Sequence, residues 1–341
     1  MRYLILIQLI ISPLLSFFSC QSIENTTTSS TSSSTSTIYT PTTTTTIFDI
    51  NTIKKDNTND IVILSLNLHT YQETNQDAKF NIIVDAIFDL SIDLIAFVEC
   101  GQNKNQPYIS GSTSIRIDNM AFIITQKMKS RYGVDYYYSW DWAHYGWDVW
   151  EEGMAVVSRY PITESDSTWI STSTSRTDIT SRKAVFGKTG IPGIGAIHLF
   201  SVHTHWMPTS TDTEHELQVS RIKDFVYSKE VSGDVSPDLS LVCGDFNCNA
   251  ANIEPWIKPY NKMVENGDFI DTFLVANPTA NNRPQDSKFN TVGGTTPGRI
   301  DYIFMKNNAK FEVVSSVITF SAYSLGTVSD HYGVITKLRL K

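Results

Sequence analysis

The segment Leu239–Ala250 combines an apolar run with polar side chains that could do chemistry. It reads L-S-L-V-C-G-D-F-N-C-N-A, so the apolar residues end at Gly244, and Asp245 and Asn247 follow. A short apolar run that stops at glycine predicts a buried strand. If the strand pleat continues, Asp245 and Asn247 share one face at the carboxyl end of that strand, where open α/β sheets bind ligands. The alternative is a local turn, since Asp, Asn and Gly also dominate turns.

Several other predicted strands also begin or end at an acid, an amide or a histidine. The full set is Asn67, Glu99, His205, Asp245, Asn247, Asp301, Asp330 and His331. Each residue alone has a local explanation, such as a turn or a helix cap, but eight at comparable positions indicate a site. Carboxylate and amide oxygens favour hard divalent ions, namely Mg²⁺, Mn²⁺ or Ca²⁺. Together with histidine and aspartate as acid–base groups, such an ion suits phosphoryl chemistry.

The elements that must position these residues are strands with helices interspersed. Helical spacing of apolar residues predicts a helix over Asp77–Leu90, and a second helix is predicted over Thr213–Tyr227. The predicted strands are Ile61–Leu66, Leu94–Val98, Ala121–Ile124, Met154–Val157, Ala196–His205, Leu239–Cys243, Ile300–Met305, Val313–Phe320 and Gly333–Leu340. This pattern fits two packed sheets covered by helices, and also a doubly wound sheet.

An ordered series of motifs resembles the endonuclease/exonuclease/phosphatase superfamily, which includes DNase I-like nucleases and neutral sphingomyelinases. The motifs are S-L-N at Ser65–Asn67, I-A-F-V-E at Ile95–Glu99, E-G-M-A-V-V-S-R-Y-P-I at Glu152–Ile162, T-H at Thr204–His205, G-D-F-N at Gly244–Asn247, R-I-D-Y-I-F at Arg299–Phe304 and S-D-H at Ser329–His331. The resemblance extends from Ile61 to the end of the chain. It implies a four-layer α/β/β/α sandwich, in which two packed mixed sheets are flanked by helices.

The resemblance implies that part of the site binds a metal ion. Glu99 would be the main metal ligand, with Asn67 beside it and Asp330 as a further carboxylate near the metal. Two positions depart from the family pattern. Val98 stands where glutamine commonly precedes the glutamate, and His69 stands where nucleases of this class often carry aspartate. The second departure bears on the number of metal ions and on the substrate.

The resemblance also implies the acid–base and phosphate-binding roles. Asp245 would orient or deprotonate the attacking water, and Asn247 would hold the scissile phosphate. His331, oriented by Asp301, and His205 would contact the phosphate or the leaving group. A carboxylate beside a histidine fixes its tautomer and raises its pKa. We therefore expect a hydrogen bond between His331 and Asp301, with Asp245 and Asn247 facing the same cavity.

His203 and His205 form a His-x-His pair, which zinc hydrolases also use. On a strand the two side chains would share a face. The other motifs do not supply the usual zinc partners, so His203 is predicted to be a packed or hydrogen-bonded neighbour. A zinc site is the alternative.

Residues Tyr136–Trp150 read Y-Y-Y-S-W-D-W-A-H-Y-G-W-D-V-W, an unusual concentration of aromatic side chains. They could fill the core between sheet and helices, form a stacking platform for bases or sugars, or lie in a lipid interface. The interspersed acidic residues disfavour an anionic nucleic acid or an anionic lipid as the ligand of this segment. Core packing and a substrate rim remain the two main interpretations.

The first 55 residues differ in composition from the rest. Residues 1–20 are predicted to be a cleaved signal peptide, because one early arginine precedes a mostly apolar stretch. Residues 21–55 are rich in Ser and Thr and predict a disordered stalk, with Asn25 as an N-glycosylation acceptor. Residues 56–341 are predicted to form the catalytic domain.

Secretion permits a disulfide, and Cys100 and Cys248 follow two expected site residues, so we expect them to pair while Cys243 stays a packed thiol.

The formal net charge of −8 and the sequence pI of about 5.4 argue against nucleic-acid binding through broad basic patches. The sequence predicts a secreted phosphoric ester hydrolase that depends on Mg²⁺, or on Mn²⁺ or Ca²⁺. A phosphodiesterase is expected, acting on a phospholipid headgroup such as that of sphingomyelin or on nucleic acid. We expect a monomer with peripheral membrane contact. The alternative is a catalytically silent surface protein of the same fold.

Overall fold

The computed structural model describes residues 49–206, 209, 211–231, 237–251, 254–280, 289–294 and 298–341. The predicted signal peptide, Cys20, Asn25 and most of the predicted stalk lie outside the described residues. Thr45–Lys341 forms one compact unit. The 3₁₀ helix η1 (Ile50–Ile53) belongs to it, because Ile53 is fully buried and Lys55 pairs with Asp93 at 2.6 Å. The folded unit therefore begins earlier than the predicted boundary at residue 56.

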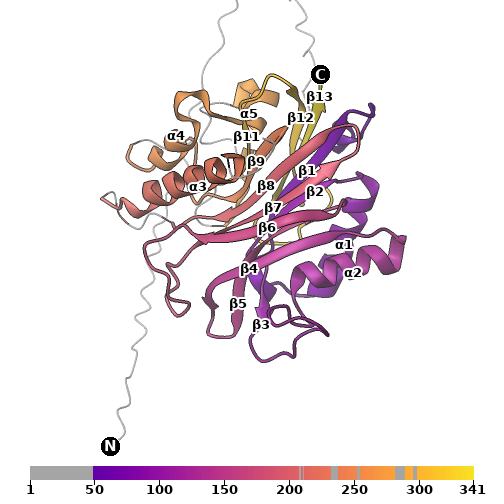
Figure 1. The fold of residues 1–341 in the computed structure, drawn as a ribbon, viewed down its shortest axis with the longest axis vertical. Helices are drawn as coiled ribbons and strands as arrows, with labels where there is room; N and C mark the ends of the chain where they lie inside the picture. Colours follow the sequence, from indigo (N-terminus) through magenta and orange to yellow (C-terminus); the bar gives the residue numbers. More distant parts are fainter. Residues whose placement is uncertain are drawn as a thin grey trace, which may run out of the picture. The chain divides into compact units, whose positions relative to one another are not determined.

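Two mixed β-sheets form the centre of this unit (Figure 1). The first has the order β12-β13-β1-β2-β5-β3, with β4 also paired to β5, and the second has the order β10-β11-β9-β8-β7-β6. The first sheet contains β1 (Asp60–Asn67), β2 (Leu94–Val98), β3 (Gln102–Asn103), β4 (Tyr137–Gly146), β5 (Trp150–Ser158), β12 (Phe311–Thr319) and β13 (Gly333–Leu340). The second contains β6 (Ile162–Trp169), β7 (Lys183–Ile191), β8 (Gly195–His203), β9 (Leu239–Asp245), β10 (Phe269–Asp271) and β11 (Asp301–Lys306). The pairs β1–β2 and β8–β9 are parallel.

Strand β1 illustrates how the sequence builds the layers. Its residues alternate: Ile61 and Ile63 pack into the core between the two sheets, whereas Val62 and Leu64 pack into the core beneath helices. Both faces are buried because both faces are covered, which is why the strand reads as a continuous apolar run.

Helices cover the outer face of each sheet (Figure 1). Helices α1 (Gln76–Asp89) and α2 (Met120–Tyr132) pack on the first sheet. Helices α3 (Glu214–Val231) and α4 (Lys258–Val264) pack on the second. The shorter elements are α5 (Thr272–Ala276), η2 (His69–Tyr71), η3 (Glu265–Gly267) and η4 (Pro278–Ala280). The result is the predicted four-layer α/β/β/α sandwich.

The strand predicted at Ala121–Ile124 is wrong, because this segment lies in α2. The Asn119 side chain caps the helix by accepting a hydrogen bond from the Phe122 N–H, and Gly133 ends it in the left-handed conformation. Four apolar residues in a row cannot distinguish a strand from a buried helical turn. The strands β3, β4, β6, β7 and β10 were not predicted.

The aromatic segment forms β4 and its turn into β5. Tyr136, Trp140 and Trp142 are buried in the core beneath α1 and α2, which agrees with the core interpretation. Trp147, at the turn, is instead 54% exposed. The segment thus serves mainly as core and presents one large indole at its tip.

The predicted Cys100–Cys248 disulfide is wrong. Cys100, Cys243 and Cys248 are all free and buried. Cys100 packs in the core between the first sheet and its helices, whereas Cys248 donates a hydrogen bond from Sγ to the carbonyl of Trp256 at 3.0 Å. Cys243 is a packed thiol between the sheets, as expected.

Within the described residues, we find no helix with both the length and the apolar character required to span a membrane.

Candidate active site

The polar residues meet at one end of the two packed sheets because of strand direction. In the first sheet, parallel β1 and β2 end side by side, with Asn67 opposite Val98 and Glu99 following directly. In the second sheet, His203 at the end of β8 is paired with Asp245 at the end of β9. Antiparallel β11 begins at the same edge, so Asp301 is also paired with Asp245. This is the arrangement expected for a ligand site in an α/β sheet.

His331 and Asp301 form the expected hydrogen bond, from Nδ1 to Oδ2 at 2.9 Å. Burial acts to lower the pKa of His331, but the charge and hydrogen bond of Asp301 outweigh it, and the pKa lies well above its usual value. The imidazole is therefore held in the charged form, with Nε2 at 3.8 Å from Oδ2 of Asp245.

Asp245 presents one carboxylate oxygen to the site. Its Oδ1 accepts the main-chain N–H of Asn247 at 2.7 Å, which leaves Oδ2 between the rings of His203 and His331, 3.8 Å from each Nε2. Burial, with the nearby charge of Asp301, raises the pKa of Asp245 to about 7. A carboxylate of this kind is suited to accept a proton near neutral pH.

Glu99, His203 and Asp245 form a candidate metal-binding cluster, with one donor atom of each within 4.8 Å of the others. Burial and the charge of Glu152 raise the pKa of Glu99 to about 8. The raised pKa indicates that the carboxylates of the cluster lack sufficient counter-charge. Burial lowers the pKa of His203 well below its usual value, so the imidazole is neutral. Two carboxylates and a neutral imidazole fit a divalent cation, and the imidazole extends the choice from Mg²⁺ and Ca²⁺ towards Mn²⁺ and Zn²⁺.

The orientation of Asn67 does not match its predicted role as a ligand. Its Oδ1 accepts the main-chain N–H of His69 at 2.9 Å, so the amide nitrogen is the atom that faces the carboxylates. That nitrogen donates to Glu99 at 2.9 Å and to Asp245 at 3.4 Å. In this arrangement Asn67 positions the two carboxylates and offers no oxygen to an ion.

Asn247 lines the same cavity as Asp245, as expected, but its amide holds a histidine. Nδ2 donates to the Thr204 carbonyl at 2.9 Å and lies 3.1 Å from Nε2 of His203. Since a carbonyl can only accept, this atom is the amide nitrogen, and one of its N–H bonds faces the Nε2 lone pair that His203 would offer to a cation. In this arrangement both N–H bonds are directed at protein atoms, so the amide makes no contact of the kind predicted with a phosphate.

His205 lies away from the cluster, and this corrects its predicted place in the site. Strand β8 ends at His203, so the alternation that would place both rings on one face stops before His205. The ring of His205 faces Asp212 at 3.2 Å, and its main-chain N–H donates to Gln218. His203, predicted as a neighbour, occupies the site instead, and no His-x-His pair converges on one ion.

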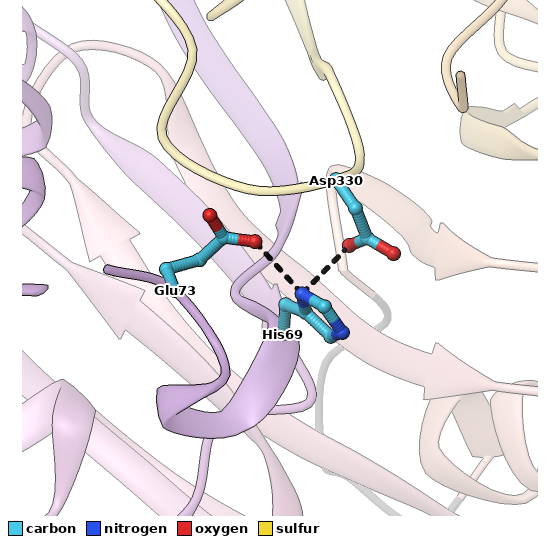
Figure 2. A group of neighbouring side chains, drawn as sticks. All are labelled: His69, Glu73 and Asp330. Atoms are coloured by element: carbon cyan, nitrogen blue, oxygen red, sulfur yellow. Dashed lines mark hydrogen bonds and ion pairs between the residues drawn. The ribbon is translucent and has the colours of Figure 1, made fainter. Parts of the chain in front are cut away.

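Asp330 also differs from its predicted place beside the metal. Figure 2 shows its carboxylate directed at His69, whose Nδ1 lies 3.3 Å from Asp330 and 2.8 Å from Glu73. Glu73 pairs in addition with Lys79. The Asp330 side chain is about half exposed and is not part of the cavity wall. His69 therefore links the loop after β1 to the segment that carries His331.

The cluster lies in a cavity of about 470 Å³. Besides His203, its walls include seven residues that were not predicted as site residues, namely His144, Gly146, Trp147, Glu152, Ile179, Arg182 and Trp206. Glu152 lies within a motif, and His144, Gly146 and Trp147 lie in the aromatic segment for which a substrate rim was one interpretation. The other three come from the approach to β7 and the segment after β8, where no local pattern marks them.

His144 and Glu152 form a buried pair on adjacent strands, with Nε2 and Oε1 3.1 Å apart. Nδ1 of His144 lies 3.0 Å from the carbonyl oxygen of Ser181 and 3.3 Å from Nη1 of Arg182. The pair thus joins β4 and β5 at the wall of the cavity.

The main chain is strained at the metal cluster. Glu99 has φ 45 and Asn247 has φ 46, although neither is glycine. Such conformations persist only where surrounding contacts hold them, and they gather at functional sites. The hydrogen bonds of Asn67 to Glu99 and of Asn247 to Thr204 supply that support.

The model of the Endonuclease/Exonuclease/phosphatase family matches residues 64–331. The chain belongs to this family. The match includes every strand of the second sheet, all strands of the first except β13 and the start of β1, and every residue of the candidate site, and it confirms the family expected from the motifs. The family comprises phosphoester hydrolases of the nuclease and phosphatase kinds, which generally use a divalent metal.

Solved structures of the family have the same fold. A family protein from Leptotrichia buccalis C-1013-b is 25% identical, with a TM-score of 0.68, covering 82% of this chain and 100% of its own. The human nocturnin catalytic domain is 14% identical, with a TM-score of 0.60 and coverage of 84% and 97%. A mannosyl-6-phosphatase from Bacteroides thetaiotaomicron VPI-5482 is 16% identical, with a TM-score of 0.55 and coverage of 82% and 99%. No curated protein sequence matches the chain.

Proposed function

We propose that this family member is a divalent-metal-dependent phosphodiesterase that acts on a phospholipid headgroup or on nucleic acid. The observation that carries the proposal is the charged His331–Asp301 pair facing Asp245 beside the Glu99–His203–Asp245 cluster. An acid, a base and a cation site within one cavity are the parts that hydrolysis of a phosphoester requires.

Each side chain has a role that follows from its geometry. Asp245 would accept the proton of the attacking water through Oδ2, the oxygen that faces the cavity. His331 would stabilise charge on the phosphoryl oxygens or donate a proton to the leaving oxygen through Nε2. Glu99 and His203 would hold the cation, Mg²⁺ or Mn²⁺, next to the Asp245 carboxylate, and the bound cation would polarise the phosphoryl group.

The cavity also bears on the size of the substrate. A volume of about 470 Å³ suits one headgroup or one nucleotide with its phosphate. Trp147, Ile179 and Trp206 are exposed apolar side chains on its wall, so they would contact the apolar part of such a group.

Purified protein should be assayed with Mg²⁺, Mn²⁺, Ca²⁺ and Zn²⁺ on sphingomyelin vesicles, RNA, plasmid DNA, an aryl phosphodiester and the matching aryl monoester. The proposal predicts metal-dependent cleavage of the diester and of at least one natural substrate. Cleavage of the monoester alone would make the protein a phosphatase. Hydrolysis of none, with any ion, would favour the silent binding protein.

The location of the protein is a separate proposal. An apolar N-terminal segment followed by a Ser/Thr-rich stretch supports secretion and glycosylation at Asn25. We further propose a monomer that contacts membranes only peripherally. Expression in a secretory host, followed by N-terminal sequencing and size-exclusion chromatography of the secreted product, tests these points.

A further inference from the structure

Arg182 is a buried cation that forms no ion pair with any carboxylate among the described residues. It directly precedes β7 and is only 3% exposed. Arg116, Arg299 and Arg339 each bind a carboxylate at close range. Among the described residues, no carboxylate oxygen lies within 4 Å of the Arg182 guanidinium, although burying an unpaired charge is costly.

The donors of Arg182 are only partly used. Nη1 donates to the main-chain carbonyls of Ile179 and Ser181. Nε is buried with no partner, and none of the described residues accepts a hydrogen bond from Nη2. Arg182 also lines the cavity that holds the metal cluster. The two carbonyls therefore fix one end of the guanidinium and leave unused donor capacity beside the cavity.

The surroundings of Arg182 change when a cation binds. Burial lowers the pKa of Arg182, and the charges of Glu152, Glu99 and Asp245 oppose this effect from across the cavity. A guanidinium remains charged throughout the physiological range. A divalent ion on Glu99 and Asp245 would neutralise two of these three carboxylates. Glu152 would then be the main carboxylate that opposes the charge of Arg182 from across the cavity, and the unused donors of Arg182 would be available to an anion.

We propose that Arg182 binds the phosphoryl group of the substrate, donating from Nη2 to a non-bridging oxygen. This inference rests on the proposed function and adds a specificity-determining residue to the same site. The Trp206 ring, whose centroid is 5.6 Å from the Arg182 guanidinium carbon, would restrict the guanidinium to the orientation that the two carbonyls set. The ligand class is a tetrahedral phosphate oxyanion, for which a fixed guanidinium is better suited than a mobile ammonium.

The test uses inorganic phosphate as the probe and the full protein with Mg²⁺. Phosphate should raise the thermal unfolding temperature of the wild type, because a ligand of the folded state stabilises it. Arg182→Met should weaken phosphate binding at least about tenfold, and Arg182→Lys should weaken it less. KM for the aryl phosphodiester should rise more than kcat falls. Binding of Mn²⁺, measured by calorimetry, should be retained in both variants.

Arg176→Met is the matched control. Arg176 lies nearby on the surface, over the ring of Trp142 and 3.9 Å from Asp141, so its loss removes the same charge outside the cavity. Phosphate binding should be unchanged in this control. If Arg182→Met does not fold, Arg182→Lys decides by the same measurements.

The inference would be overturned by wild-type phosphate binding in the Arg182 variants, with or without a loss of stability, or by a wild type that binds no phosphate. Failure of the proposed function has a different signature. The wild type would then hydrolyse no phosphoester, although phosphate binding would still depend on Arg182.

Discussion

His331 and Asp301 are thirty positions apart in the chain, yet they share a 2.9 Å hydrogen bond that links the two sheets. Asp301 opens β11 in the second sheet, and His331 lies two residues before β13 in the first. Asp301 is fully buried, and its other oxygen has no partner among the described residues. The imidazolium is thus the main counter-charge of this carboxylate, and each group requires the other.

His331→Ala should lower turnover at least about a hundredfold, the usual scale for losing an acid–base group. Asp301→Asn should act in the same direction, because the ring loses the charge that keeps it protonated. Turnover and thermal unfolding should be measured on the same preparations. A folded His331→Ala protein with a normal rate would remove His331 from the mechanism.

The sheet layers could be predicted, because a strand that is buried on both faces has a continuous apolar sequence. Strands β1, β2 and β9 are continuous apolar runs, and their polar ends were found at the ends of those runs. What could not be predicted was the direction of individual side chains. His205 follows the last residue of β8 by two positions, and its ring turns to Asp212 only because the strand has ended.

The direction of the asparagine side chains could not be predicted from the sequence either. Asn67 was placed correctly at the end of β1, but which atom of its amide faces Glu99 is decided by the main-chain N–H of His69. Arg182 was missed for a related reason. Nothing in its local sequence marks it, because its significance comes from the lack of an ion pair among the described residues and from a cavity that distant segments form.

Replacing the two neighbouring histidines should separate their roles. His203→Ala removes a donor of the metal cluster and should lower activity about a hundredfold at limiting metal, with weaker Mn²⁺ binding. His205→Ala should retain most of the activity, because that ring contacts Asp212 outside the cavity. A larger loss from His205→Ala than from His203→Ala would reverse this assignment.

Gly244→Ala should destabilise the fold. Gly244 has φ 143, and a Cβ placed there would lie 1.9 Å from the carbonyl oxygen of Val202 on β8. We expect a loss of at least about 2 kcal/mol in the free energy of unfolding, because strained backbone and a main-chain clash combine. Gly190→Ala is the control, since a Cβ there meets nothing within 4 Å. Equal stabilities of the two variants in urea unfolding would refute the argument.

Stability should fall as pH drops from about 6.5 towards 4. His198 is buried among Phe186 and Phe200 with both ring nitrogens unpaired, and burial lowers its pKa from 6.5 to about 4. In that interval the unfolded chain binds a proton that the folded protein does not, so stability rises with pH.

The variant His198→Leu should lose less stability than the wild type between pH 7 and pH 5. Part of the pH dependence of stability should remain in this variant, because burial also lowers the pKa of His215 to about 4. Denaturant unfolding at the two pH values measures the difference. An unchanged pH dependence in His198→Leu would show that His198 is not responsible.

We propose that Glu99 holds the metal on which hydrolysis depends, and the substitution Glu99→Gln tests this assignment. This substitution keeps the size of the side chain and removes the charge whose burial raises its pKa to about 8, so the fold should be at least as stable. Turnover of an aryl phosphodiester and Mn²⁺ binding should be measured across a titration of the ion. We expect a loss of at least about a hundredfold in turnover at limiting metal, with weakened Mn²⁺ binding and an unchanged unfolding temperature. Near wild-type turnover of Glu99→Gln at limiting metal would contradict it.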